Sequence, residues 1–236
     1  MSIFTGDKNI YPSVISGPTV YESPTVYDTG AGGGGGGGGE YFGVVKIGDI
    51  DYPYIQFGDK FIITKNLDFK LDEFSFGTGS SSDPLVCYYG QDETTAKDQE
   101  LGLLYNWAAT KYLIDNYDFG DGWKIIDNDI IQQINILFNP SYNTYSAKNT
   151  CRKHTTWASS NWNNEGNNKS HLSFIPSGRL VNGQFEAKGS YFRMWTGPTN
   201  ICWSLAVSPY STWPGLDTLS QDCFCSIRLF KQMNDL

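Results

Sequence analysis

Few of the side chains that carry catalysis or hold metal ions are present in this chain of 236 residues. Its two histidines, His154 and His171, stand in neither an HExxH nor a His-x-His arrangement, the spacings that bring imidazoles together on one metal ion. Both lie in polar sequence, which favours surface histidines. No motif pairs a nucleophile with a base. We therefore expect a protein that is not an enzyme and that binds no cofactor and no metal.

The five cysteines do not form a recognisable metal or redox motif either. Cys223 and Cys225 are separated by one residue, whereas zinc and redox pairs commonly have two between them. In a strand their Cα atoms would lie about 6.5–7 Å apart with parallel side chains, which is poor geometry for a mutual disulfide. We interpret the cysteines as free thiols of a protein made in a reducing compartment, with these two buried in a strand.

Four aspartates lie close together in the sequence: Asp118, Asp121, Asp127 and Asp129. Carboxylates bind Ca²⁺, but their spacing is not that of an EF-hand loop and its closing Glu is missing. Turn formation and helix capping account for these residues without a metal, and Asp127 is the predicted N-cap of a helix.

Aromatic side chains make up 15% of the chain and are its best candidates for binding. Flat rings next to amide groups suit contacts with sugars or protein surfaces. The candidate ligand-binding residues lie in loop-like sequence and are Trp162, Asn163, Asn164, Tyr210 and Trp213. Packing in the core is an equally good interpretation of each of them, and it is the expected role of Trp203, which alternates with apolar residues in a predicted strand.

Composition excludes several classes of protein. With 25 acidic against 17 basic side chains the net charge is −8, which argues against nucleic acid or an anionic membrane as the main partner. No apolar run approaches the ~20 residues needed to span a bilayer, so no membrane insertion is expected. The chain begins without a basic segment followed by an apolar one, and we expect no secretory signal.

The first 40 residues differ in composition from the rest. Proline recurs at positions 12, 18 and 24 and valine at 14, 20 and 26, which predicts an extended segment whose valines share one side. Such a strand needs a partner, so residues 1–30 are predicted to anchor or oligomerise the chain; a disordered tail is the alternative. The candidate contacts are Val14, Val20, Val26, Tyr21 and Tyr27. Residues 31–40, with an unbroken run of eight glycines, are the predicted neck.

Residues 41–236 read as one α+β domain. Strands are predicted near 40–48, 57–67, 201–207 and 223–229, and a loop at 77–84. One helix is predicted within 98–117, with Leu101, Leu104 and Tyr105 on its apolar face, and a second from Asp127 to Pro140. Residues 141–168 are predicted to be a long loop.

Ordered blocks of this domain resemble the Fibrobacter succinogenes major paralogous domain. The blocks are Tyr41-x-x-Val-Val-Lys-Ile-Gly-Asp, Thr64-Lys-Asn-Leu-Asp-Phe, Leu101-Gly-Leu-Leu-Tyr-Asn-Trp-Ala-Ala-Thr, Gly120-Asp-Gly-Trp, Phe174-Ile-Pro-Ser-Gly-Arg-Leu, Gly183-Gln-Phe, Tyr191-Phe-Arg-Met-Trp-Thr and Ser226-Ile-Arg-Leu-Phe. The resemblance implies a C-type lectin-like fold, with two helices on small twisted antiparallel sheets and a long variable loop region. Residues 49–60 depart from the family pattern as an insertion.

The same fold hosts formylglycine-generating enzymes, but their Arg-Gly-Gly-Ser-type motif and paired catalytic cysteines are not found here. Trp162-Asn163-Asn164 is similar to the Trp-Asn-Asp triplet with which C-type lectins coordinate Ca²⁺, yet no Glu-Pro-Asn triplet accompanies it. The resemblance therefore favours binding without calcium over catalysis.

Family members on bacterial surfaces generally carry an export signal, so its expected absence favours a bacteriophage virion protein, such as a head fibre or capsid decoration. Residues 1–30 would then attach to the capsid or another virion protein, in a homotrimer rather than a dimer, and the head would adhere to a host-surface glycan or protein. The alternatives are a bacterial surface or secreted adhesin and, less favoured, an enzyme on the formylglycine-generating fold.

Overall fold

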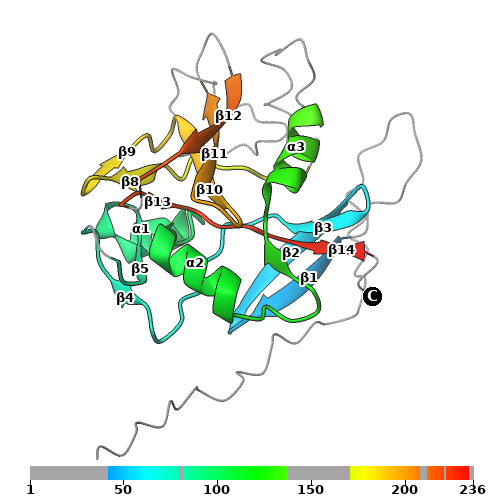
Figure 1. The fold of residues 1–236 in the computed structure, drawn as a ribbon, viewed down its shortest axis with the longest axis horizontal. Helices are drawn as coiled ribbons and strands as arrows, with labels where there is room; N and C mark the ends of the chain where they lie inside the picture. Colours follow the sequence, from blue (N-terminus) through cyan, green and yellow to red (C-terminus); the bar gives the residue numbers. More distant parts are fainter. Residues whose placement is uncertain (1–41, 80–81, 138–170, 208–211, 221, 234–236) are drawn as a thin grey trace, which may run out of the picture.

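The computed structural model describes residues 42–79, 82–137, 171–207, 212–220 and 222–233 (Figure 1). The predicted anchor, the neck and the 141–168 loop lie outside these residues. The described part is a mixed α+β structure made mostly of sheets with few helices, which confirms the predicted class. None of its helices has the length and apolar character needed to cross a membrane.

The first sheet joins the start of the described chain to its end. Its strand order is β1 (Phe42–Ile47), β2 (Ile50–Phe57), β3 (Lys60–Ile63), β14 (Leu229–Gln232) and β7 (Lys124–Ile125), with every neighbouring pair antiparallel. Figure 1 shows the blue N-terminal strands beside the red β14. Residues 49–60, expected as an insertion, thus supply the whole of β2, which pairs on both sides and buries Tyr52 and Ile55.

Two further sheets complete the fold. The six-stranded sheet has the order β4 (Ser75–Phe76), β5 (Leu85–Cys87), β6 (Leu104–Asn106), β13 (Phe224–Cys225), β8 (Arg179–Val181) and β9 (Gln184–Glu186), and only β4–β5 is parallel. The three-stranded antiparallel sheet contains β10 (Tyr191–Thr196), β11 (Ile201–Val207) and β12 (Thr212–Thr218). The predicted strand at 223–229 is therefore divided between β13 and β14, although Cys223, Cys225 and Leu229 still enter one core.

The helical prediction for 98–117 is wrong in its first half. The structure has η1 (Tyr89–Gln91), α1 (Glu93–Asp98) and then the strand β6 before α2 (Trp107–Asn116). Gly102 has φ +70°, a conformation that interrupts a right-handed helix, and a Cβ there would meet the Leu67 carbonyl oxygen at 2.9 Å. Asn106 then caps α2 by accepting a hydrogen bond from the Ala109 N–H. Leu104 and Tyr105 consequently lie in a sheet.

The helix predicted from Asp127 is confirmed as α3 (Asn128–Leu137), and its predicted end at Pro140 lies outside the described residues. Ile130, Ile131 and Ile134 are fully buried on its inner face, as the 3.6-residue period predicts. They pack in a second core with Phe174 and with side chains of the three-stranded sheet, including Trp203.

Arg228 connects this second core to other segments of the chain. Its side chain is fully buried, and its guanidinium lies over Phe174, 4.7 Å from the ring centroid. It donates to the Leu172 and Ser173 carbonyls and, at 2.9 Å, to the Asn66 side-chain oxygen. Such complete pairing is what makes a buried charge tolerable.

Candidate functional site

Two adjoining depressions form the groove that we take as the candidate site. The first has a volume of about 550 Å³ and is lined by Leu113, Ile114, Asp115, Asn116, Tyr117, Asp118, Phe119, Gly122, Trp123, Lys124, Ile125, Asp127, Gly197, Pro198 and Phe230. The second, of about 450 Å³, is lined by Lys60, Gly122, Lys124, Asp127, Asp129, Ile130, Gln133, Phe230 and Gln232. Because they share four residues, we treat them as one feature and call it the Asp127 groove.

The turn between α2 and β7 builds one wall of the groove. Asp118 accepts a hydrogen bond from the Gly120 N–H at 2.8 Å, and the Trp123 N–H donates to the Gly120 carbonyl at 2.9 Å. Positive φ angles at Gly120 (+77°), Asp121 (+46°) and Gly122 (+76°) make the turn tight. Trp123 is 4% exposed and packs edge-on against Tyr54, so it forms floor, whereas Asp118 is exposed at the rim.

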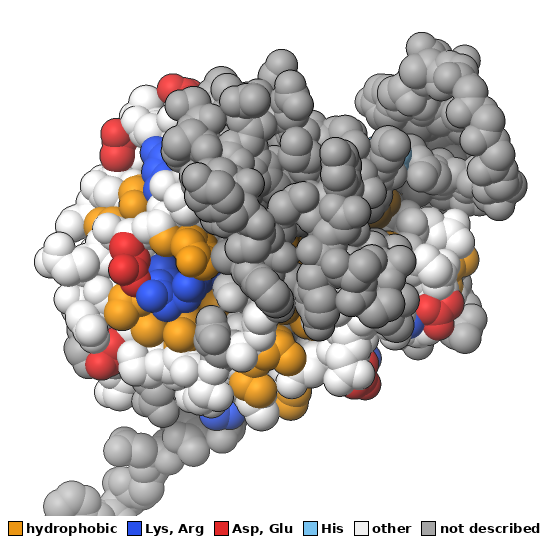
Figure 2. Space-filling view, turned by 90° about the horizontal axis from the view of Figure 1, so that it is seen from above, with side chains coloured by type: hydrophobic (Ala, Val, Ile, Leu, Met, Phe, Trp, Pro, Cys, Tyr) orange, Lys and Arg blue, Asp and Glu red, His pale blue; other side chains and the backbone are white. Residues whose placement is uncertain are grey.

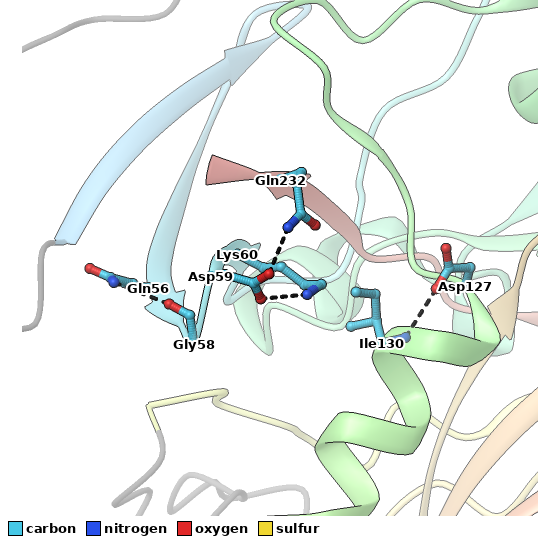
Figure 3. A network of polar contacts seen from close by, with 7 residues as sticks. All are labelled: Gln56, Gly58, Asp59, Lys60, Asp127, Ile130 and Gln232. Carbon is cyan, nitrogen blue, oxygen red and sulfur yellow. Dashed lines mark hydrogen bonds and ion pairs between the residues drawn. The ribbon is translucent and has the colours of Figure 1, made fainter. Parts of the chain in front are cut away.

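Asp127 lies where the two depressions meet. Its Oδ1 atom accepts from the Ile130 N–H at 3.0 Å, which caps α3, and Figure 3 shows the other carboxylate oxygen directed away from the helix. The preceding residue, Ile126, is held on both sides: its N–H donates to the Arg228 carbonyl at 3.0 Å, and its carbonyl accepts from the Gly197 N–H at 2.9 Å. The backbone that presents Asp127 is therefore fixed by two other segments.

The second depression is bounded by a small polar network (Figure 3). Lys60 donates to Asp59 at 2.5 Å, and the Gln232 amide donates to the other Asp59 oxygen at 2.7 Å. These two hydrogen bonds hold the pKa of Asp59 below its usual value. Lys60 is 7% exposed, and Figure 3 shows its side chain reaching from β3 toward the start of α3. A turn of the first sheet and the chain's last strand thus supply this end of the groove.

The polar side chains of the groove are mainly acceptors. The carboxylates of Asp115, Asp118, Asp127 and Asp129 outnumber the ammonium groups of Lys60 and Lys124. One of these carboxylates is already paired, since Lys111 donates to Asp115. The described residues that line the groove include no serine, cysteine or histidine. In the described part of the chain, no three His, Cys, Asp or Glu residues are placed to hold a metal ion.

Near the β8–β9 hairpin, two basic side chains are engaged with neighbouring side chains. Figure 2 shows basic side chains among hydrophobic ones on the side where β8 and β9 lie. In that hairpin Arg179 forms an ion pair with Glu186 at 2.6 Å, and the Lys188 ammonium lies over the Tyr89 ring, 5.4 Å from its centroid. Side chains that already contact each other in this way are less suited to bind a ligand than the polar side chains of the groove.

An exposed aromatic ring stacked on a buried one forms another surface feature. Phe76, 58% exposed, stacks on Tyr88 with a centroid distance of 5.8 Å, and Lys70 lies over its ring at 5.8 Å. Tyr88 also contacts Asp68, a carboxyl whose pKa is raised by burial. We prefer the groove because it combines a hollow with convergent polar groups, which this flat pair lacks.

Most of the predicted site residues lie outside the described part of the chain. These are the ligand candidates Trp162, Asn163, Asn164 and Tyr210, and the anchoring candidates Val14, Val20, Val26, Tyr21 and Tyr27. The backbone of Trp213 belongs to β12, opposite Ala206 of β11, and its side chain is outside the description. Trp203 is fully buried, as predicted.

Three of the four clustered aspartates line the groove. Asp118 and Asp127 make the turn and cap contacts expected of them, and with Asp129 they also line the groove, whereas Asp121 does not. The four described cysteines are free thiols, as predicted, and all are buried, as predicted for Cys223 and Cys225, whereas Cys151 lies outside the described residues.

The sequence interpretation missed several groove residues, namely Lys60, Asn116, Lys124, Pro198 and Gln232. Four aspartates around the aromatic residues Phe119 and Trp123 were the one signal in the sequence that pointed to this groove.

Comparison of the chain with protein-family models, with curated proteins and with solved structures finds no match. What the groove binds must therefore be inferred from its own side chains.

Proposed function

We propose that this chain is a non-enzymatic structural protein of a bacteriophage virion, a head fibre or capsid decoration, whose head (residues 41–236) adheres to a host-surface glycan through the Asp127 groove. The observation that supports adhesion is the groove itself, whose apolar floor is bordered by carboxylate, amide and ammonium groups. Its two depressions fall within the usual ~300–1,000 Å³ of small-molecule sites.

A glycan fits these groups better than other ligands do. A sugar ring presents hydroxyl groups at its edge and C–H groups on its faces. Carboxylates such as Asp118 and Asp127 accept hydrogen bonds from hydroxyl groups, Lys124 donates, and Asn116 does both. The floor, which includes Phe119 and Trp123, offers apolar surface to the C–H face. The excess of carboxylates disfavours a strongly anionic glycan.

We further propose that the head has a C-type lectin-like fold and resembles the Fibrobacter succinogenes major paralogous domain. Support comes from where the resembling blocks lie. The Leu101–Thr110 block contains the strand and cap that start α2, and the Ser226–Phe230 block contains the buried Arg228. The two longer helices, α2 and α3, match the number that the resemblance implies.

The virion assignment rests on the resemblance and on the predicted anchor of residues 1–30. A bacterial surface or secreted adhesin would use the same groove, so binding tests alone do not separate the two. An enzyme on the formylglycine-generating fold is disfavoured because no serine, cysteine or histidine is among the described groove residues.

The adhesive function is tested by binding of the full chain to a glycan array. Asp118→Asn keeps the oxygen that accepts from Gly120, so the turn is retained while the charge is lost. Loss of a charged hydrogen bond should weaken binding roughly 10- to 100-fold. Asp121→Asn makes the same change in the same turn outside the groove and should bind normally. If both variants bind equally well, the groove is not the glycan-binding site.

Trp213→Ala tests the ligand face predicted from the sequence. If this variant loses binding while Asp118→Asn keeps it, the ligand lies on the β12 side of the molecule and the groove proposal is wrong. If no glycan binds the wild-type chain, the adhesive function itself is wrong.

The anchor is tested on particles. Cryo-EM of virions carrying the full chain or the chain without residues 1–30 should show density for the head only with the full chain. If the truncated protein still occupies the particle, the anchor proposal is wrong. We expect a homotrimer rather than a dimer, because glycine-rich segments let three backbones approach closely about an axis, and analytical ultracentrifugation measures this directly.

A further inference from the structure

Two cysteines from different sheets lie side by side in the core. Cys202 is in the middle of the three-stranded sheet on β11, and Cys225 is in the six-stranded sheet on β13. Their sulfur atoms are 3.3 Å apart, and both residues are fully buried. They are separated by 23 positions in the chain. No other pair of thiols in the described part of the chain is this close.

The backbones that carry these sulfur atoms are held together by hydrogen bonds. The Trp195 N–H donates to the Ser226 carbonyl at 2.9 Å, and the Ser226 N–H donates to the Arg193 carbonyl at 3.1 Å. Trp195 is the direct neighbour of Cys202 in the β10–β11 register, and Ser226 follows Cys225 in the chain. The backbones of Cys202 and Cys225 are therefore held side by side by paired strands.

The distance to be closed is small. A disulfide bond is about 2.05 Å long, so the two sulfur atoms must approach by little more than 1 Å, within the range of side-chain rotation. The other described cysteines are placed differently. Cys223 contacts the Ser220 hydroxyl at 3.4 Å, and Cys87 lies in a separate cluster around β5, β6 and β8.

We propose that Cys202 and Cys225 are a latent disulfide, which forms in the folded protein when it meets a peroxide oxidant and then links the three-stranded sheet to the six-stranded sheet. The inference is independent of the proposed adhesive function. Hydrogen peroxide is a suitable oxidant because it is comparable to water in size and can enter a closed core during local opening.

The reaction balances with one molecule of hydrogen peroxide. One cysteine, as thiolate, attacks a peroxide oxygen; the O–O bond breaks, a sulfenic acid forms, and the departing hydroxide takes up a proton to become water. The second thiolate then attacks the sulfenic sulfur, the S–O bond breaks, and a second water leaves. Two thiols lose two protons and two electrons in total, and the peroxide is reduced to two waters.

Burial of Cys225 explains why the pair stays reduced before it meets the oxidant. It raises the pKa of the Cys225 thiol well above its ordinary value, and the neighbouring Cys202 acts in the same direction. Little Cys225 thiolate is present at neutral pH, so its reaction should be slow and should proceed through transient opening of the core. A protein made in a reducing compartment would keep both thiols and acquire the bond after release.

The test uses the purified full chain, incubated without denaturant in reductant or in dilute hydrogen peroxide. Peroxide treatment should lower the intact mass by two hydrogen atoms, and a non-reducing peptide map should contain Cys202 linked to Cys225. Closing a loop of this length should raise the thermal midpoint by roughly 5–10 °C. Cys202→Ala should abolish the shift, whereas Cys87→Ala, the matched buried control, should retain it.

Three outcomes would overturn the proposal: a native protein that gives no Cys202–Cys225 peptide after prolonged oxidation, a bond to Cys151 or Cys223 instead, or a bond that appears only after unfolding. If Cys202→Ala does not fold, the wild-type peptide map and the midpoint shift on oxidation decide the question without it.

Discussion

Asn106 is the residue whose replacement tests the architecture of the head most directly. It is 1% exposed and lies where β6 passes into α2. Its side-chain oxygen accepts from the Ala109 N–H at 2.8 Å and from the Leu85 N–H at 3.0 Å, and its side-chain nitrogen donates to the Asp83 carbonyl at 2.8 Å. One amide therefore caps a helix and also attaches the start of β5 to the end of β6.

The cost of Asn106→Ala follows from these three bonds. Loss of an N-cap costs about 1 kcal/mol. The Leu85 N–H and the Asp83 carbonyl then lose these hydrogen bonds in a partly buried place, at about 1–2 kcal/mol each. Their sum is about 3–5 kcal/mol, and for a domain of this size the thermal midpoint should fall by roughly 10–15 °C.

Asn106→Asp is the sharper test. At an ordinary cap Asp and Asn are equivalent, and here Asp keeps the oxygen that faces Ala109 and Leu85. It also replaces the donor that faces the Asp83 carbonyl with a second acceptor, so we expect a loss of about 2–3 kcal/mol. The matched control is Asp127→Asn at the cap of α3, where the side chain makes the single bond to Ile130 and the change should cost under about 1 kcal/mol.

Thermal and urea denaturation followed by far-UV circular dichroism measure both changes. If Asn106→Asp is as mild as Asp127→Asn, the hydrogen bond from Asn106 to the Asp83 carbonyl contributes nothing to stability. If Asn106→Ala is equally mild, the attachment of β5 through this side chain is wrong as well.

Two further predictions concern stability. Because burial raises the pKa of Asp68 above its ordinary value of 3.8, its contribution to folding is full below that value and is lost as the pH rises through the raised pKa. Asp68→Asn should therefore raise the thermal midpoint relative to wild type at pH 7 but not at pH 3; equal differences at both would contradict this. Gly178 and Gly183, at φ +69° and +74°, both flank β8, but a Cβ at Gly178 would meet the Glu186 carbonyl at 2.7 Å whereas Gly183 faces open space. Gly183→Ala should cost about 1 kcal/mol and Gly178→Ala clearly more in urea denaturation, and equal costs would be evidence against the close approach.

The sequence predicted elements wherever periodicity and a terminating residue agreed. The 3.6-residue spacing of isoleucines after the cap Asp127 gave α3, and the alternation around Trp203 gave β11. At Leu101–Tyr105 a short apolar run fitted a helix and a strand equally well. There the positive φ of Gly102, which the helical pattern did not reveal, decided for the strand.

The groove was predictable only in part. The local roles of Asp118 and Asp127 could be predicted because a turn and a cap involve residues within three positions of each other. Lys60, Pro198 and Gln232 lie far from them in sequence, and no local rule joins these segments. They meet because β14 inserts between β3 and β7 and because Gly197 pairs with the backbone of Ile126.

This dependence on distant segments also bears on how the groove would bind. The backbone at Ile126 is held by Arg228 on one side and Gly197 on the other, and Asp127 is additionally fixed by its bond to Ile130. The Arg228 side chain is itself locked in the second core by carbonyl groups. A ligand that binds beside Asp127 would therefore have little backbone to order, and the entropy that binding usually costs would be reduced there. Under the proposed function, several copies of the head on one particle would bind together, and even weak binding by each groove would add up to strong attachment through avidity.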